Sequence, residues 1–193
     1  WGLDVVVSAS QKCLMMPPGA AFLAFSERAR AYLERCEGSR YYFDLRRYEQ
    51  FLEKGETPFT PNIHIVFALE ETLNMLEAEG LANVYARHAL MRDMTRAGIR
   101  ALGLELLVSD EDASPTLTAV RHPQADEFRK GIRLKYGVEF AGGQGVHAGR
   151  VFRIGHMGYA TPLDVLTALA VLEVELQKFG QATAAAERVL AAR

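Results

Sequence analysis

The chain has few cysteines and no long apolar run. Its 193 residues include only two cysteines, Cys13 and Cys36, which are too few for a disulfide framework and fit no metal-ligand spacing. Uninterrupted apolar runs are short, such as Gly19 to Phe25, and a membrane span needs roughly 18 residues. We therefore expect reduced thiols, a cytoplasmic location and no membrane partner. The first residues also lack a secretory signal and resemble the middle of a fold.

An excess of charge of one sign is missing as well. The chain has 22 basic and 24 acidic side chains, for a net charge of -2. A nucleic-acid-binding protein would show a basic excess on one face or in one tail, so we expect no nucleic-acid partner. Hydrophobic residues make up 49% of the chain and charged residues 24%, as in ordinary folded proteins. One domain, or two small ones, is expected.

Short apolar runs and turn residues predict a mixed α/β organisation in the first part of the chain. The run from Leu3 to Val7 is apolar and β-branched, which is typical of a buried strand in a parallel sheet. Ser26 is suited to cap a helix because its hydroxyl can accept from a free backbone N–H. The other elements expected here are a turn at Pro17–Gly19, a strand at Ala20–Phe25, a helix from Ser26 to Cys36, a helix at Leu45–Lys54 and an extended loop at Thr57–Asn62.

The second part begins with two long helices. Apolar residues recur at helical spacing over Ile63–Glu79 and again over Leu81–Ala101, with Gly80 as the stop between them. Short strands and helices then alternate, which predicts an α+β layer packed on one face of a small sheet. The expected strands are Leu104–Val108, Thr116–Val120, Val138–Ala141 and Val151–Ile154, and the expected helices are Ala125–Tyr136, Pro162–Phe179 and Ala182–Ala191.

Lys12 is the first candidate for chemistry. It follows the predicted strand at Leu3–Val7, and open α/β sheets bind ligands in the crevice outside the carboxyl ends of their strands. A deprotonated lysine amine can attack a carbonyl carbon. Position alone leaves a second interpretation open, because most loop lysines are solvated surface charges.

The segment from Asp4 to Gly19 strongly resembles the cofactor-lysine segment of class V aminotransferases, in particular the alanine–glyoxylate and serine–pyruvate aminotransferase group. In that family the lysine of a Ser-Gln-Lys-x-Leu-x-x-Pro-Pro-Gly motif forms a Schiff base with pyridoxal phosphate, and it falls on Lys12. The loop Thr57–Pro61 and the segments Gly142–Gly145 and Val151–Gly155 also match the family in order and spacing. The resemblance covers essentially the whole chain.

The resemblance implies an α/β fold, the C-terminal part of a fold-type I pyridoxal-phosphate transferase. Residues 1–79 would be the end of the large cofactor-binding domain, and residues 80–193 the small C-terminal α+β domain. The family's glycine-rich phosphate loop, stacking aromatic ring and aspartate for the pyridine nitrogen precede the lysine and cannot be assigned here. An N-terminal half of the same enzyme is therefore an expected partner, as is a second copy in a homodimer with shared active sites.

The resemblance also implies roles for residues in the first part of the chain. Lys12 would bind the cofactor and act as the catalytic base, and the Gln11 amide would contact the cofactor phosphate unless it is only a solvated loop residue. Thr57 and Thr60 would reach the phosphate of the neighbouring subunit's site, although threonines beside prolines are also common in turns. Some family members carry Tyr at Thr57. Cys13 is expected to be a packed small hydrophobe.

Arg153 is the candidate for substrate binding. Strand alternation places it on the face opposite Phe152 and Ile154. The segment resembles the family's carboxylate-binding strand, and a guanidinium can grip an α-carboxylate through two parallel hydrogen bonds. The alternative is an arginine that points to solvent. The five histidines are scattered without the spacing of a metal site, so no metal is expected.

The expected function is transfer of an amino group between a small amino acid, alanine or serine, and a small 2-oxo acid, glyoxylate or pyruvate, with pyridoxal phosphate as cofactor. One alternative is a cysteine desulfurase-like lyase of the same fold. Such enzymes typically carry His before the lysine, where this chain has Gln11, and need a catalytic Cys far downstream, which this chain lacks. Another alternative is a non-catalytic dimerisation fragment built on the long helices.

Overall fold

The computed structural model describes all residues, 1–193. Contacts within the chain divide it into two compact units, Trp1–Met75 and Leu76–Arg193. None of the seven helices combines the length and the apolar character that a bilayer crossing requires.

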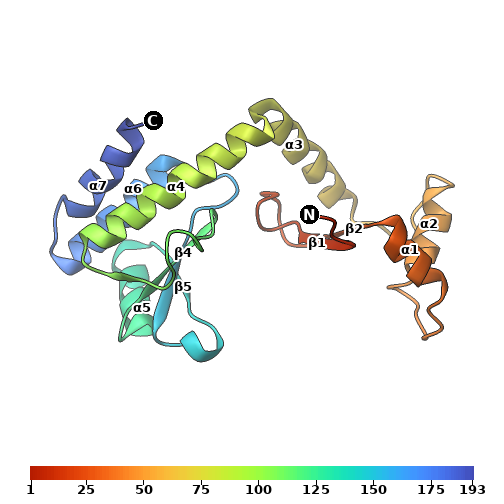
Figure 1. Ribbon diagram of the computed structural model, residues 1–193, viewed down its shortest axis with the longest axis horizontal. Helices are drawn as coiled ribbons and strands as arrows, with labels where there is room; N and C mark the ends of the chain where they lie inside the picture. Colours follow the sequence, from red (N-terminus) through yellow and green to blue (C-terminus); the bar gives the residue numbers. More distant parts are fainter. The chain divides into compact units, whose positions relative to one another are not determined.

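The first unit begins with an antiparallel hairpin of β1 (Val5–Ala9) and β2 (Ala21–Phe25), shown in red in Figure 1. The sequence interpretation of a buried strand in a parallel sheet is wrong for this chain. Val5 and Val7 are 53% and 69% exposed, and β1 pairs only with β2. A β-branched run favours any pleated strand, and the short return of the chain makes the partner antiparallel because a parallel partner needs a longer crossover.

Two capped helices follow the hairpin. Helix α1 (Glu27–Glu34) begins as predicted after Ser26, whose side chain accepts from the backbone N–H of Ala29. Helix α2 (Leu45–Leu52) has Asp44 as its cap. Both helices end two residues earlier than predicted, since α1 stops before Arg35 and α2 before Glu53. The predicted loop Thr57–Asn62 contains neither helix nor strand.

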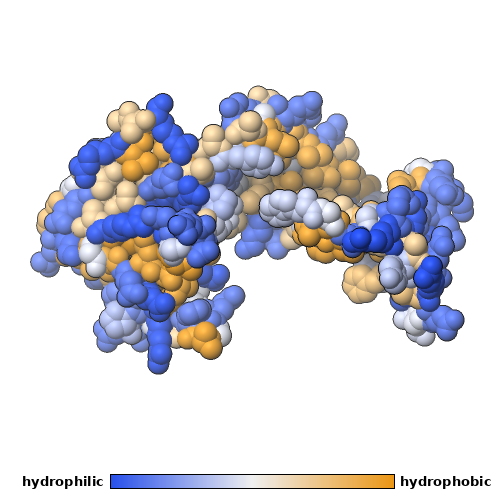
Figure 2. Space-filling view, viewed as in Figure 1, coloured by the Kyte–Doolittle hydropathy of each residue, from blue (hydrophilic) through white to orange (hydrophobic).

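The two long helices have the predicted bounds, α3 at Ile63–Glu79 and α4 at Leu81–Ala101. Gly80 lies between them with φ of 81°, a left-handed value that glycine adopts without steric cost. Apolar side chains remain exposed on α3, and Figure 2 shows hydrophobic surface along this helix. They are Ile63, Val66, Phe67 and Leu73.

The second unit is built on a four-stranded antiparallel sheet in the order β3-β4-β6-β5. The strands are β3 (Glu105–Leu106), β4 (Leu117–Arg121), β5 (Ala141–Gly142) and β6 (Val151–Gly155). The predicted strand at Val138–Ala141 is misplaced. Pairing starts only at Ala141, because Phe140 is buried in the core with its ring centroid 5.7 Å from that of Phe152.

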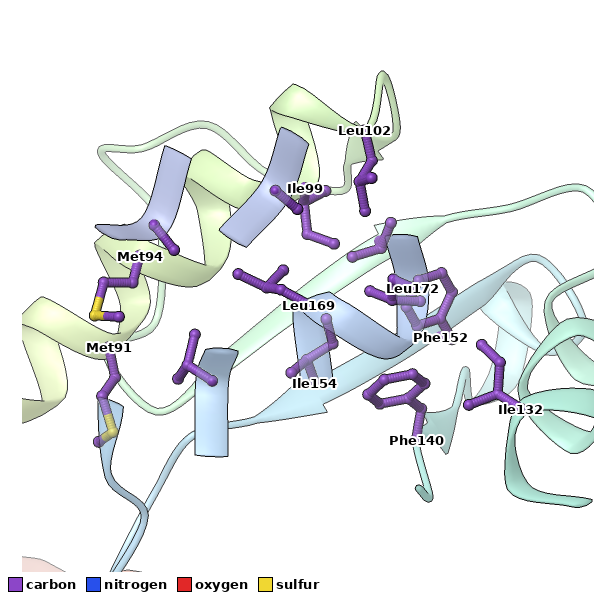
Figure 3. Close-up of a cluster of buried hydrophobic side chains, with 14 of the residues drawn as sticks. Met91, Met94, Ile99, Leu102, Ile132, Phe140, Phe152, Ile154, Leu169 and Leu172 are labelled. Atoms are coloured by element: carbon purple, nitrogen blue, oxygen red, sulfur yellow. The ribbon is translucent and has the colours of Figure 1, made fainter. Parts of the chain in front are cut away.

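Helices cover one face of this sheet. Val120, Phe152 and Ile154 share that face and are buried against side chains of the helices (Figure 3). The helices are α4, α5 (Ala125–Tyr136), α6 (Pro162–Leu176) and α7 (Gln181–Ala191), with a short 3-10 turn at Gly145–His147. Helix α6 ends before the predicted Phe179 because Gln177 adopts a left-handed φ of 53°. The predicted helical layer on one face of a small sheet is confirmed. Arg153 lies on the opposite face of the sheet.

Candidate active-site residues

Lys12 lies in the loop that joins β1 to β2. The hairpin ladder continues one pair beyond the strands, because the backbone N–H of Ser10 donates to the carbonyl of Ala20 at 3.1 Å. Between these two residues the chain forms the loop that carries Gln11 and Lys12. The Lys12 side chain is exposed, and its amine has no hydrogen-bond or ion-pair partner within the chain. Its amine is therefore open to a ligand.

Ser10 connects both ends of this lysine loop. Its side chain is fully buried, and its hydroxyl donates to the carbonyl of Pro17 at 2.7 Å and accepts from the N–H of Ala20 at 3.3 Å. Its own carbonyl accepts from the N–H of Met16 at 3.1 Å. Sequence reasoning missed this role. The sequence signal for it was the alternation of β1. Extended by one residue pair, this alternation places Ser10 opposite Ala20, next to the diproline turn.

The turn that follows Lys12 is tight. The carbonyl of Lys12 accepts from the N–H of Met15 at 2.9 Å, and Met15 has a left-handed φ of 58°. At the far end Gly19 has φ of 150°, and a Cβ there would lie 3.3 Å from Cδ1 of Ile65. The backbone angle favours glycine at this position, and any larger residue would also have to push the Ile65 side chain aside. These constraints fix the loop without any contact to the Lys12 amine.

The two chain neighbours of Lys12, Gln11 and Cys13, are both exposed. Gln11 is exposed, so its amide can reach a ligand. Cys13 is exposed too, and the expectation that it is a packed small hydrophobe is wrong. The loop lies at the surface of the first unit and offers no core for the thiol. Both Cys13 and Cys36 are free cysteines.

The Thr57–Pro61 loop is anchored by Phe59. The Phe59 ring packs against Tyr41 and Tyr42, with centroids 5.4 and 4.8 Å away, and the guanidinium of Arg47 lies 4.9 Å from its centroid. The Thr57 hydroxyl donates to the Phe59 carbonyl at 2.8 Å. Thr60 is exposed and its hydroxyl has no partner in the chain. The two threonines therefore differ, since only Thr60 has an uncommitted proton.

Arg153 lies in β6 of the second unit, on the face away from the helices. It is half-buried, while its neighbours Phe152 and Ile154 are buried in the core, so the predicted alternation is confirmed. Its cross-strand neighbours are Ala119 in β4 and Ala141 in β5. Both neighbours have small side chains.

The guanidinium of Arg153 makes one hydrogen bond within the chain. Its Nε donates to the carbonyl of Gly142 at 2.8 Å, and no acidic side chain forms an ion pair with it. Most arginines that are not fully exposed here have such a partner, as Arg96 has Asp110 and Arg129 has Asp126. A half-buried arginine whose Nη groups are unpaired can bind an anion with little competition.

The segment after β6 is held by the start of α4. Nη1 of Arg87 donates to the carbonyls of Gly158 and Ala160 at 2.9 and 2.8 Å, while the rest of its guanidinium pairs with Glu79. The Arg87 hydrogen bonds lower the pKa of the Glu79 carboxyl. Nε2 of His88 accepts from the N–H of Gly158 at 3.1 Å. This network fixes the chain that leaves the strand of Arg153.

The two buried histidines have structural partners. His88 bonds the Val84 carbonyl through Nδ1. His156 bonds the Thr118 hydroxyl at 2.9 Å and the Pro115 carbonyl at 3.1 Å. Burial lowers the pKa of His156 to about 4, so it is neutral at pH 7. No group of three or more His, Cys, Asp and Glu side chains in the structure is arranged to hold a metal ion.

Most of the chain matches one protein family. A sequence model described as "Aminotransferase class-V" matches residues 1–157. The chain belongs to the class V aminotransferase family. The resemblance drawn from the lysine segment is therefore confirmed.

Curated proteins resemble the chain along nearly all its length. The "Soluble hydrogenase 42 kDa subunit" of Anabaena cylindrica is 40% identical over 181 residues, which are 93% of this chain and 47% of that protein. A serine–glyoxylate aminotransferase of Arabidopsis thaliana is 34% identical over 185 residues, 93% of this chain and 46% of its own length. The chain thus spans about half the length of these curated relatives.

A solved structure gives the same result for the fold. The crystal structure of pyridoxamine–pyruvate aminotransferase from Mesorhizobium loti superposes with a TM-score of 0.91 at 35% identity. It covers 98% of this chain, which corresponds to 52% of the solved chain. The predicted fold class, part of a pyridoxal-phosphate aminotransferase fold, is confirmed.

Proposed function

We propose that this chain carries the cofactor lysine and the carboxylate-binding arginine of a pyridoxal-phosphate-dependent aminotransferase. The enzyme would move an amino group between a small amino acid, alanine or serine, and a small 2-oxo acid, glyoxylate or pyruvate. The observation that carries the proposal is Lys12, an exposed lysine with an unpartnered amine on a loop fixed by the buried Ser10. The names of the relatives support the type of substrate.

The side chains of the first unit fit pyridoxal phosphate chemically. An aldehyde needs an accessible amine, which Lys12 offers, and a phosphate needs hydrogen-bond donors. Gln11 has an exposed amide and Thr60 an exposed hydroxyl, whereas Thr57 would have to give up its bond to the Phe59 carbonyl before it could donate. When bound, pyridoxal phosphate supplies an electron sink for the negative charge that develops at the amino acid's α-carbon.

Lys12 has two tasks in this proposal. Its ε-amine would hold the cofactor through the aldehyde carbon. Once the substrate amine takes that place, the freed Lys12 amine would remove the proton from the α-carbon and return it two bonds away, across the nitrogen, at the former aldehyde carbon. The fixed loop serves this transfer, because Ser10 and the turn after Lys12 restrict where the amine can reach.

Arg153 would hold the α-carboxylate of both substrates. The amino acid and the 2-oxo acid share this group, so one arginine can serve both half-reactions. Arg153 is half-buried, its cross-strand neighbours are the small residues Ala119 and Ala141, and its guanidinium has no acidic partner. A carboxylate would find there two parallel N–H donors and a full positive charge.

The proposal includes two macromolecular partners. One is the N-terminal half of the same enzyme, supported by the span of about half of the relatives' length and by exposed apolar side chains on β1 and α3. The other is a second copy of the chain in a cytoplasmic homodimer, in which Thr57 and Thr60 would serve the neighbouring subunit's phosphate. The anchored Phe59 supports this role, because it holds the loop that presents both hydroxyls.

The absorption spectrum of the complete protein tests the proposed function. We expect a yellow protein-bound cofactor that loses its visible band on addition of alanine or serine and regains it on addition of glyoxylate or pyruvate. A protein that never binds the cofactor would instead be a non-catalytic fragment. A bound cofactor whose reaction releases sulfide from cysteine would favour the desulfurase alternative.

A further inference from the structure

We propose that Gly142 and Gly143 are positioning residues for Arg153, and that they make its guanidinium grip the substrate carboxylate end-on, through Nη1 and Nη2. The inference rests on the proposed function, in which Arg153 binds that carboxylate. It specifies which guanidinium nitrogens bind the carboxylate and which backbone residues orient them. Gly142, Gly143 and Arg153 all lie in the second unit.

The carbonyl of Gly142 occupies the side edge of the guanidinium. Nε of Arg153 donates to it at 2.8 Å. Gly142 belongs to β5, which pairs with β6 so that Ala141 faces Arg153 and Gly142 faces Phe152. The next residue, Gly143, donates its N–H to the carbonyl of Val151 at 2.7 Å. Two backbone contacts therefore fix the carbonyl of Gly142 against β6, the strand that carries Arg153.

Close packing explains why both residues are glycines. A Cβ on Gly142 would lie 3.0 Å from Nε of Arg129 and 3.2 Å from Oδ1 of Asp126, two side chains that already form an ion pair at 2.9 Å. A Cβ on Gly143 would overlap the carbonyl oxygen of His147. Neither glycine has a left-handed φ, so the requirement is close approach rather than backbone freedom.

The hydrogen bond to Gly142 decides how a carboxylate can bind. A guanidinium offers two bidentate edges, one with Nε and one Nη, the other with both Nη groups. The carbonyl of Gly142 takes the Nε–H and excludes the first edge. The four N–H groups on Nη1 and Nη2 have no partner in the chain, so the end-on edge is the one that remains for the substrate.

Substitutions in the complete enzyme test this inference. In Gly143→Ala the new methyl must displace the β5 backbone, so we expect the KM of both the amino acid and the 2-oxo acid to rise about tenfold or more, with the cofactor band retained. Gly131→Ala is the matched control. Gly131 lies in α5 rather than in the strands around Arg153, lacks a left-handed φ, and has no atom within 4 Å of its Cβ position, so its KM values should stay near wild type.

A second pair of variants covers the case in which Gly143→Ala fails to fold. Gly142→Ala should raise both KM values, and the double variant Gly142→Ala with Arg129→Ala should lower them again, because the nearest obstacle to the new methyl is gone. A crystal structure of the complete enzyme with bound glyoxylate gives a direct readout. We expect the carboxylate on Nη1 and Nη2, with Nε still on the Gly142 carbonyl.

Three results would overturn the inference. They are a carboxylate bound to Nε, KM values in Gly143→Ala equal to those of Gly131→Ala, and Gly142→Ala kinetics that do not differ from wild type. If Arg153→Ala loses substrate affinity while the glycine variants keep it, only the inference fails. If the wild-type protein binds no cofactor and Arg153→Ala changes nothing, the proposed function fails with it.

Discussion

The hydroxyl of Ser10 donates a 2.7 Å hydrogen bond to the carbonyl of Pro17, and so ties the start of the lysine loop to its diproline turn. The same oxygen accepts from the N–H of Ala20 at the end of the loop. Ser10 is fully buried, whereas Lys12 two residues later is exposed. A buried serine thus fixes the backbone from which an exposed lysine extends.

Replacing Ser10 tests this relationship. Ser10→Ala removes the hydrogen bonds to Pro17 and Ala20 and should lower the free energy of unfolding by about 1 kcal/mol for a typical bond. It should also weaken attachment of the cofactor to Lys12. Chemical denaturation and cofactor titration of the complete protein measure the two effects. Ser8→Ala is the control, because Ser8 lies in β1 but is exposed. Equal behaviour of the two variants would contradict the role of Ser10.

Arg153→Ala should lower kcat/KM. The loss of transition-state stabilisation should be roughly 2–5 kcal/mol, the scale for removing one partner of a desolvated charged pair. The loss should appear for the amino donor and for the 2-oxo acid acceptor alike, because both carry the same carboxylate. Arg150→Ala serves as control, since Arg150 is exposed one residue before β6 and has no ion-pair partner. Unchanged kinetics for either substrate would remove Arg153 from its proposed role.

Thr60→Val should weaken cofactor binding more than Thr57→Val, because only Thr60 has a hydroxyl proton that the chain does not already use. If the two sites of a dimer share this loop, dilution should release cofactor together with monomer. Equilibrium sedimentation with detection of the cofactor band measures both. A monomer that binds cofactor with undiminished affinity would contradict a shared site.

Glu173 gives a prediction about stability and pH. Its carboxylate is buried, and it accepts from the N–H groups of Gly180 and Thr183 at 3.0 and 2.7 Å. Burial disfavours the charge, but these hydrogen bonds outweigh burial and lower the pKa. Glu173→Gln places an amide N–H against a backbone donor, and should cost about 1–3 kcal/mol at pH 7.

The same pKa shift sets the pH window. A pKa that is lower in the folded state means stability that is present above the unfolded value, about 4.3 for glutamate, and lost as pH falls through the folded value. The difference in unfolding free energy between wild type and Glu173→Gln should therefore shrink as pH falls below about 4.3. Glu187→Gln, at an exposed position of α7, should show no such change. A difference that grows on acidification would contradict the assignment.

The long helices were predictable from the sequence because local signals and packing agree. Apolar spacing and Gly80 gave the bounds of α3 and α4 without error, and Ser26 marked the start of α1. The short strands were less predictable. In β5 only Ala141 and Gly142 pair, and Phe140 contributes to the core rather than to the ladder. Tertiary packing sets this strand boundary, and no local sequence pattern shows it.

The candidate site was predictable only in part, for a similar reason. Lys12 and Arg153 stand out through residue type and motif, so a sequence suffices to find them. Ser10, Gly142 and the Arg87–Glu79 pair act through hydrogen bonds whose partners lie 7 to 73 positions away in the chain. Such contacts depend on the folded backbone, so the sequence did not show them, although Gly142 lies in a segment that matches the family.

The most direct test of the account is to locate the residue that holds the cofactor. The complete protein is reduced with borohydride, which fixes a lysine-bound aldehyde permanently, and is then digested and analysed by mass spectrometry. We predict that the modified peptide contains Lys12 and no other modified lysine, and that Lys12→Ala loses the yellow band, the modified peptide and nearly all turnover. A Lys12→Ala protein that keeps its band and is still labelled by borohydride at another lysine would contradict the central claim.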